Sequence, residues 1–143
     1  MKNNFILLIL FPFFGISQND IKTNKNLNEV FTVFYNVENF FDTINCPLTN
    51  DDEFLPTSEK KWNSEKYFHK IKQLEKVFLG LSADENNNFF PDLIGLCEVE
   101  NEIVVNDLLS NTSLKNNNYN LVHKDSPDGR GIDCALLFSK KFK

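Results

Sequence analysis

Two apolar stretches of the chain end in side chains that could bind a metal ion. Asn36 and Glu38 follow the run VFTVFY, and Glu98 and Glu100 follow the apolar residues of PDLIGLC. Carboxylate and amide oxygens are hard ligands that suit Mg²⁺, Mn²⁺ or Ca²⁺. Because a carboxylate is not sealed in a core without a partner or a metal, we expect Glu98 at a strand end beside a cleft.

A third polar group lies in and after the loop sequence SPDGRG, and it consists of Asp128, Arg130 and Asp133. The guanidinium of Arg130, flanked by glycines, could contact a phosphate through two donors. Convergence of the three groups on one site is a hypothesis at this point. Ordinary strand-end capping and loop salt bridges would use the same residue types.

Apolar periodicity predicts the elements that would position these groups. We expect strands at 30–37, 91–101, 119–124 and 132–139, and helices at 63–81 and 101–110. The first helix would begin at Asn63 or Ser64 and carry an apolar face of Tyr67, Ile71, Leu74, Phe78 and Leu81. Strand, helix, strand and helix followed by a hairpin predict a mixed α/β or α+β sandwich.

The segment around Leu93–Cys97 is nearly continuously apolar, which is typical of a strand covered on both faces. Its Cys97, and Cys134 in the last strand, are therefore expected as small core residues, although a bridge between them is an alternative. With Cys46 the three cysteines have no metal-ligand spacing. In the long loop 40–62, the acid run Asp51–Glu53 is interpreted as solvated because its spacing fits no calcium loop.

The first seventeen residues have the pattern of a signal peptide. Lys2 precedes the apolar run Phe5–Phe14, and Gly15 and Ser17 stand before an expected cut at Gln18. The run is too short to span a bilayer. We therefore expect an exported protein, periplasmic or extracellular, with a polar leader at 18–29 and no membrane contact after cleavage. The formal charge of the full chain is −5, and this gives no general field that would attract a polyanion.

The stretches FTVFYNVENFFD, PDLIGLCEVEN and DSPDGRGIDCALLF, in this order, resemble the amino-terminal half of the endonuclease/exonuclease/phosphatase superfamily, the group that contains deoxyribonuclease I. Within it they are most similar to predicted extracellular nucleases of bacteria. The resemblance covers residues 30–143. It implies the first half of a four-layer αββα sandwich.

The resemblance also implies roles for individual residues. Glu98 matches the family's metal-binding glutamate, and Asn36 matches the asparagine that assists metal and phosphate positioning. Arg130, Asp133 and Glu38 match positions that border the substrate. The implied reaction is hydrolysis of a phosphodiester, such as nucleic acid, with a divalent metal, most simply Mg²⁺, with Mn²⁺ or Ca²⁺ as alternatives.

The family's general-base histidine belongs to a second half that this sequence does not include, so the chain alone is expected to be inactive. Two alternatives remain at this point: a non-catalytic or binding chain of the same fold, and a phosphoesterase acting on a phospholipid or sugar phosphate. An uncovered face of the sheet is expected to promote self-association. His69 is interpreted as a surface residue, and His123 as either a cleft or a surface residue.

Overall fold

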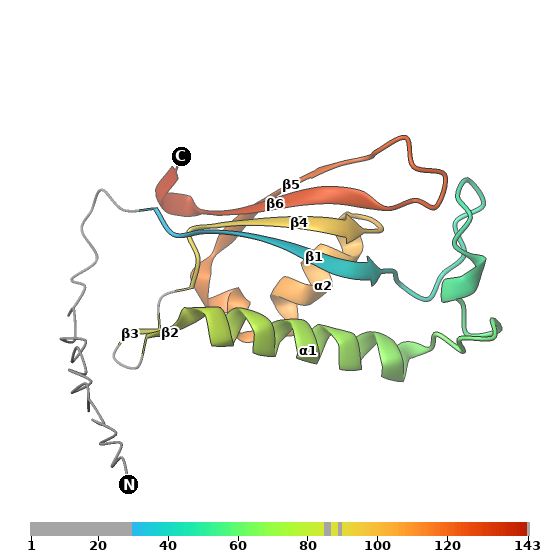
Figure 1. Cartoon of the computed structure of the whole chain (residues 1–143), viewed down its shortest axis with the longest axis horizontal. Helices are drawn as coiled ribbons and strands as arrows, with labels where there is room; N and C mark the ends of the chain where they lie inside the picture. Colours follow the sequence, from blue (N-terminus) through green and yellow to red (C-terminus); the bar gives the residue numbers. More distant parts are fainter. Residues whose placement is uncertain (1–29, 85–86, 89, 143) are drawn as a thin grey trace, which may run out of the picture.

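The computed structural model describes residues 30–84, 87–88 and 90–142. Its main sheet has the strand order β1-β4-β6-β5, as Figure 1 shows. The strands are β1 (Thr32–Phe40), β4 (Leu93–Val99), β5 (Tyr119–Lys124) and β6 (Asp133–Ser139), and a two-residue pair, β2 (Ala83–Asp84) and β3 (Asn87–Asn88), lies beyond the first helix. The mixed α/β fold predicted from the sequence is confirmed.

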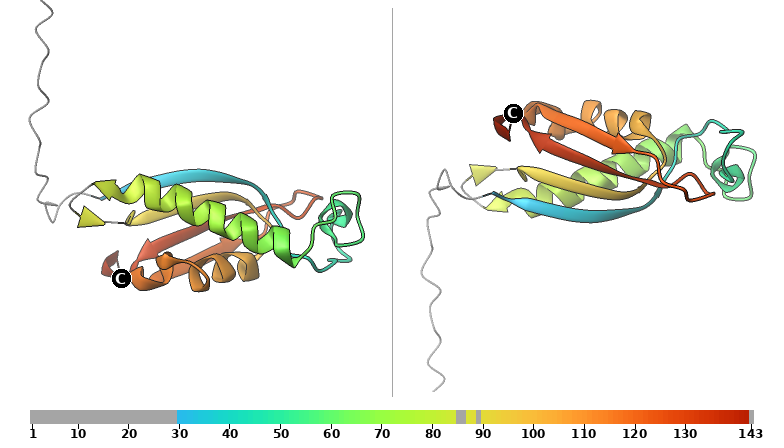
Figure 2. Two further views of the ribbon diagram at one scale, coloured as in Figure 1. Left: turned by 90° about the horizontal axis from the view of Figure 1, so that it is seen from below. Right: turned by 90° about the horizontal axis from the view of Figure 1, so that it is seen from above.

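Both long helices lie on the same face of this sheet (Figure 2). They are α1 (Ser64–Ser82) and α2 (Glu102–Ser110), and the short 3-10 turns are η1 (Asp52–Phe54), η2 (Ser113–Asn117) and η3 (Lys140–Phe142). None of the helices in the described part of the chain is long and apolar enough to cross a membrane. The expected signal peptide and leader lie outside the described residues.

The chain runs from β1 through α1 to β4, and the two strands pair in parallel. Asn63 begins α1 as expected, because its Oδ1 accepts the Lys66 N–H at 3.1 Å. Asn101 begins α2 in the same way, accepting the Val104 N–H at 3.0 Å. The expected hairpin is also confirmed, since β5 and β6 pair antiparallel. Caps satisfy backbone donors that a helix start leaves free.

The core lies between the helices and one face of the sheet. Ile94, Leu96 and Leu137 are fully covered there, and Ile71 and Phe78 of α1 pack against them. Leu81 is the exception to the predicted helix face, because it is exposed while Ser82 is buried. The helix continues one residue beyond the predicted end, and its last turn rotates Leu81 away from the sheet.

The opposite face of the sheet is open in the described part of the chain. Phe34 is 77% exposed, and Val122 and Leu136 are also exposed. Cys97 and Cys134 lie on this face, so the prediction that they are core residues is wrong. The pattern typical of a strand covered on both faces is also misleading for β4, whereas the expected uncovered face of the sheet is present in the described residues. An apolar pattern indicates that a strand face is hydrophobic, but it does not indicate which part of the structure packs on that face, or whether any part does.

The long loop between β1 and α1 packs against the β5–β6 loop. The Asn50 N–H donates to the Gly129 carbonyl at 2.8 Å, and Gly131 approaches Thr49 so closely that a Cβ would lie 2.7 Å from it. Asp51 is buried and accepts the Cys46 N–H at 2.8 Å. The interpretation of the acid run as solvated is therefore wrong for Asp51, whose carboxylate holds the loop together.

Candidate functional site

Strands β1 and β4 break their regular pairing at the same level, just where each ends. The register shifts between Asn36 and Phe40 on β1 and between Cys97 and Val99 on β4. Glu38, Asn39 and Glu98 have φ values of 57°, 59° and 65°. Bulges re-aim side chains, and left-handed backbone in residues other than glycine is strained. Strain of this kind is concentrated at functional sites.

The two bulges bring Glu98 against the end of β1. Asn36 Nδ2 donates to Glu98 Oε1 at 2.9 Å, and the Asn39 N–H donates to Glu98 Oε2 at 3.0 Å. Asn36 Oδ1 in turn accepts the Glu38 N–H at 2.7 Å. Each carboxylate oxygen of Glu98 thus has one donor and keeps further lone-pair capacity. The side chain is oriented and partly exposed, which fits a ligand for a hard divalent cation.

Glu100 lies two residues further along and has a different environment. It is buried, and its Oε2 accepts the Asp42 N–H at 2.6 Å. Burial raises the pKa of Glu100 to about 7; the hydrogen bond from the Asp42 N–H acts against this shift, and the nearby charges of Asp42, Asp51 and Asp133 add to it. A carboxyl group that titrates near neutrality can hold a proton two residues from Glu98.

Lys70 approaches the same strand ends from α1, and sequence reasoning missed it. Its Nζ donates to the Glu38 carbonyl at 2.9 Å. Burial lowers the pKa of Lys70, while the charges of Glu38 and Glu98 raise it. One hint of this contact is present in the sequence, which is that Lys70 lies next to His69 on the helix that follows β1. The contact between Lys70 and Glu38 depends on the length and direction of the lysine side chain, and apolar periodicity does not predict either.

Arg130 lies in the β5–β6 loop with its guanidinium held by Asp128. Nε and Nη2 donate to the two carboxylate oxygens at 3.1 and 2.9 Å. These bonds, together with the charge of Glu98, raise the pKa of Arg130, and Arg130 lowers the pKa of Asp128. The Arg130 guanidinium, which was predicted to contact a phosphate, therefore binds Asp128 of its own loop. It remains exposed to solvent at the Glu98 end of the sheet.

Asp133 and His123 form a second polar cluster. Asp133 is buried, accepts the Ser126 N–H at 2.6 Å and lies 3.1 Å from His123 Nε2. Asp125 Oδ1 lies 3.7 Å from His123 Nδ1. The three side chains are close enough to hold one cation, but Asp125 is almost fully exposed. Asp133 fixes the start of the β5–β6 loop by accepting the Ser126 N–H. Its contact with substrate stays a prediction.

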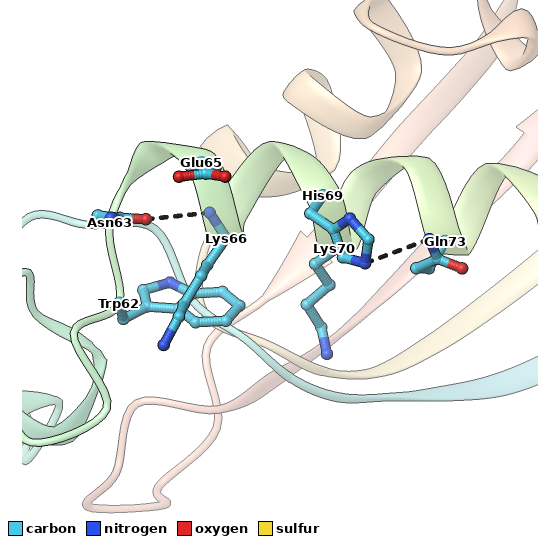
Figure 3. Close-up of a pocket in the computed structure, with 7 residues that line it drawn as sticks. All are labelled: Trp62, Asn63, Glu65, Lys66, His69, Lys70 and Gln73. Atoms are coloured by element: carbon cyan, nitrogen blue, oxygen red, sulfur yellow. Dashed lines mark hydrogen bonds between the residues drawn. The ribbon is translucent and has the colours of Figure 1, made fainter.

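A cavity of about 500 Å³ runs along the exposed side of α1 (Figure 3). Its lining residues are Trp62, Asn63, Glu65, Lys66, His69, Lys70 and Gln73. His69 is exposed as predicted, and its Nε2 lies 3.3 Å from Gln73 Nε2. Because Lys70 belongs to the cavity and also binds the Glu38 carbonyl, the cavity adjoins the strand ends that carry Glu98.

The structure brings together three of the five residues selected from the sequence. Asn36, Glu38 and Glu98 form one hydrogen-bonded unit, and Arg130 is near enough for the charge of Glu98 to act on it. Asp133 belongs instead to the His123 cluster. The geometry of Asn36 and Glu98 is compatible with metal binding, and this role stays a prediction.

Comparison with known proteins supplies an independent observation. A model of the endonuclease/exonuclease/phosphatase family matches residues 31–143. No curated protein and no solved structure gives a significant match. The matched region contains every strand of the main sheet, both long helices and the hydrogen-bonded unit at Glu98.

Proposed function

The chain belongs to the endonuclease/exonuclease/phosphatase family, and we propose that within this family's metal-dependent phosphoester chemistry it serves as an exported nuclease. The observation that carries the proposal is the Glu98 carboxylate, oriented by Asn36 Nδ2 and the Asn39 N–H at matched bulges. A preorganised, partly exposed carboxylate is the feature that a divalent metal requires.

In this proposal Glu98 is the principal metal ligand, and Mg²⁺ is the expected ion, with Mn²⁺ or Ca²⁺ as alternatives. The bound metal would stabilise negative charge on the phosphoryl oxygens. Asn36 is proposed in supporting contact: its Nδ2 orients Glu98, and its Oδ1, which accepts the Glu38 N–H, keeps a second lone pair for the metal. Arg130 is proposed to contact a phosphate while its guanidinium also binds Asp128. We therefore expect it to contribute less to substrate binding than a free guanidinium would.

The cavity along α1 is the proposed place for the part of the substrate beyond the scissile bond. Lys66 and Lys70 supply positive charge there, and Trp62 supplies an aromatic surface. This local charge is consistent with a chain of net charge −5, since a polyanion would be attracted at one place only. A single-stranded polynucleotide fits this combination, because its bases stack on aromatic rings and its phosphates pair with lysines.

We propose that Glu98 and the cavity bind metal and substrate, and that neither histidine activates the attacking water. Hydrolysis needs a group that activates water. Both histidines of the sequence are engaged elsewhere, His69 beside Gln73 and His123 beside Asp133. The open sheet face adds a second proposal, which is that copies of the chain associate through it, because Phe34 and Leu136 leave apolar surface in water.

Metal binding gives the first test. Mn²⁺ binding to the full chain, followed by electron paramagnetic resonance, should weaken at least tenfold in Glu98→Gln, since the neutral amide removes the ligand charge. Glu59→Gln is the matched control, because Glu59 is an exposed loop residue. Equal Mn²⁺ affinities in the two variants would contradict the assignment of Glu98.

Substrate binding gives the second test, and the chain contains a built-in reporter. Trp62 is the single tryptophan of the sequence and lines the cavity. Single-stranded DNA should quench its fluorescence, and Lys66→Gln should weaken the effect several-fold. Quenching by phospholipid vesicles or a sugar phosphate instead of DNA would favour the phosphoesterase alternative. No response to any of these would contradict the placement of substrate in this cavity.

Export is tested separately. Amino-terminal sequencing of the mature protein should begin at or near Gln18, since Phe5–Phe14 with small residues before the cut is typical of a cleaved signal. Recovery of an intact Met1 in the membrane fraction would contradict the proposal.

A further inference from the structure

Two of the three cysteines lie opposite each other on neighbouring strands. Cys97 of β4 and Cys134 of β6 are paired in the antiparallel register, and their Sγ atoms are 4.0 Å apart. Both are exposed on the open face of the sheet, so a reagent in solution can reach them. Cys46 lies in the long loop and is only partly exposed. The chain thus has one cross-strand pair of thiols, Cys97 and Cys134, and one separate thiol, Cys46.

From this arrangement we propose that Cys97 and Cys134 are a disulfide-forming pair that joins β4 to β6. A disulfide has an S–S distance of about 2.05 Å, so the sulfurs must approach by roughly 2 Å. Rotation about the two Cα–Cβ bonds can supply this movement, because the backbones are already paired. A metal site is the weaker reading of the same pair, since structural zinc requires four ligands and the two thiols supply two.

The oxidation is a thiol–disulfide exchange with a small disulfide such as oxidised glutathione. One protein thiolate attacks the reagent disulfide and releases one reduced glutathione. The second protein thiolate then attacks the mixed disulfide and releases the other. The protein loses two hydrogens as two electrons and two protons, and the reagent gains them as two thiols.

The bridge would brace the candidate site. Cys97 immediately precedes Glu98, and the regular β4–β6 register ends between Cys97 and Val99. A covalent link at the last regular pair fixes the strand at the point where Glu98 takes its positive φ of 65°. It also closes a long segment of chain between the two strands, which restricts the unfolded state.

Thiol counting and melting test the proposal on the full chain. Incubation with oxidised glutathione should lower the number of free thiols from three to one, and peptide mapping should find Cys46 as the free one. Tm should rise by roughly 10 °C in the oxidised protein and fall back on reduction. Hydrogen exchange at the amides of Glu98 and Val99 should slow when the bridge is present.

Variants separate the pair from the lone thiol. Cys46→Ser should keep the rise in Tm, whereas Cys97→Ser and Cys134→Ser should lose it and melt like the reduced wild-type chain. Three thiols that persist under oxidised glutathione, or a bridge that includes Cys46, would overturn the proposal. A bridge that forms without slowing exchange at Glu98 and Val99 would overturn its bracing role.

Discussion

The two faces of the sheet have similar apolar content but opposite surroundings. On the helix face Ile94 and Leu137 are fully buried under α1 and α2, whereas on the open face Phe34 and Leu136 meet solvent. The carboxylates at the strand ends follow the same division, with Glu100 buried and Glu98 partly exposed. The covered face holds the fold together, and the open face is free to make further contacts.

The largest expected effect comes from neighbouring leucines of β6 that point to opposite faces. Leu137→Ala should lower the free energy of unfolding by about 3 kcal/mol, because it leaves a cavity in the core. Leu136→Ala should cost less than about 1 kcal/mol, since that side chain is already partly in water. Urea denaturation measures both. Equal losses would mean that the open face is covered in solution.

The next effect is a pH dependence on the covered side. The folded chain raises the pKa of Glu100 from 4.5 to about 7, so it holds this proton more tightly than the unfolded chain does. The stability from this group is therefore complete below pH 4.5 and is lost as the pH rises through 7. The loss should be on the order of 3 kcal/mol, at about 1.36 kcal/mol for each unit of the pKa.

Glu100→Gln should remove that dependence, because the amide cannot ionise and its oxygen can still accept the Asp42 N–H. Melting curves of both proteins between pH 4 and 8 provide the measurement. Parallel curves across this range would show that Glu100 does not titrate near neutrality in the folded chain.

A smaller effect concerns association through the open face. Phe34→Lys should weaken self-association about tenfold, because it places a charge at the most exposed of the three apolar side chains Phe34, Val122 and Leu136 on this face. Leu79→Lys is the matched control, since Leu79 is an exposed apolar residue of α1 on the other side of the molecule. Sedimentation velocity over a range of concentrations should separate the two. Equal weakening would place the contact elsewhere.

The smallest effect should come from Gly95. A Cβ there would lie 2.4 Å from the Phe34 ring, but that ring faces solvent and can rotate away. Gly95→Ala should therefore change the free energy of unfolding by less than about 1 kcal/mol. Gly80→Ala in α1 meets nothing within 4 Å and should stabilise the chain slightly. A cost of several kcal/mol for Gly95→Ala would mean that the ring is held in place by a partner.

Much of the fold followed from local patterns. Periodicity predicted α1 and the four main strands, and Asn63 marked the helix start because capping is a local event. The convergence of Asn36 and Glu98 was a hypothesis based on their places at strand ends, and the structure has the two side chains 2.9 Å apart. The contact of Lys70 with Glu38 was not, because it depends on the angle at which α1 crosses β1.

The second property that local patterns did not reveal is which residues lie on the uncovered face of the sheet. Cys97 and Cys134 have apolar neighbours in sequence, as core residues do, yet both are exposed. The difference lies in which layer packs on each face, and this is decided by the whole topology. Asp51 shows the reverse case, since a charged residue in an acid run became buried once its oxygen accepted the Cys46 N–H.

The parallel pairing of β1 with β4 has a consequence for the order of folding. Asn36 and Glu98 are separated by 62 residues, whereas β5 and β6 form a local hairpin. Pairings that close long loops form slowly, because the chain loses entropy before it gains contacts. We therefore expect the hairpin early and the β1–β4 ladder late. The hydrogen bond between Asn36 and Glu98 would be among the last to form, so no metal-competent intermediate should precede the native chain.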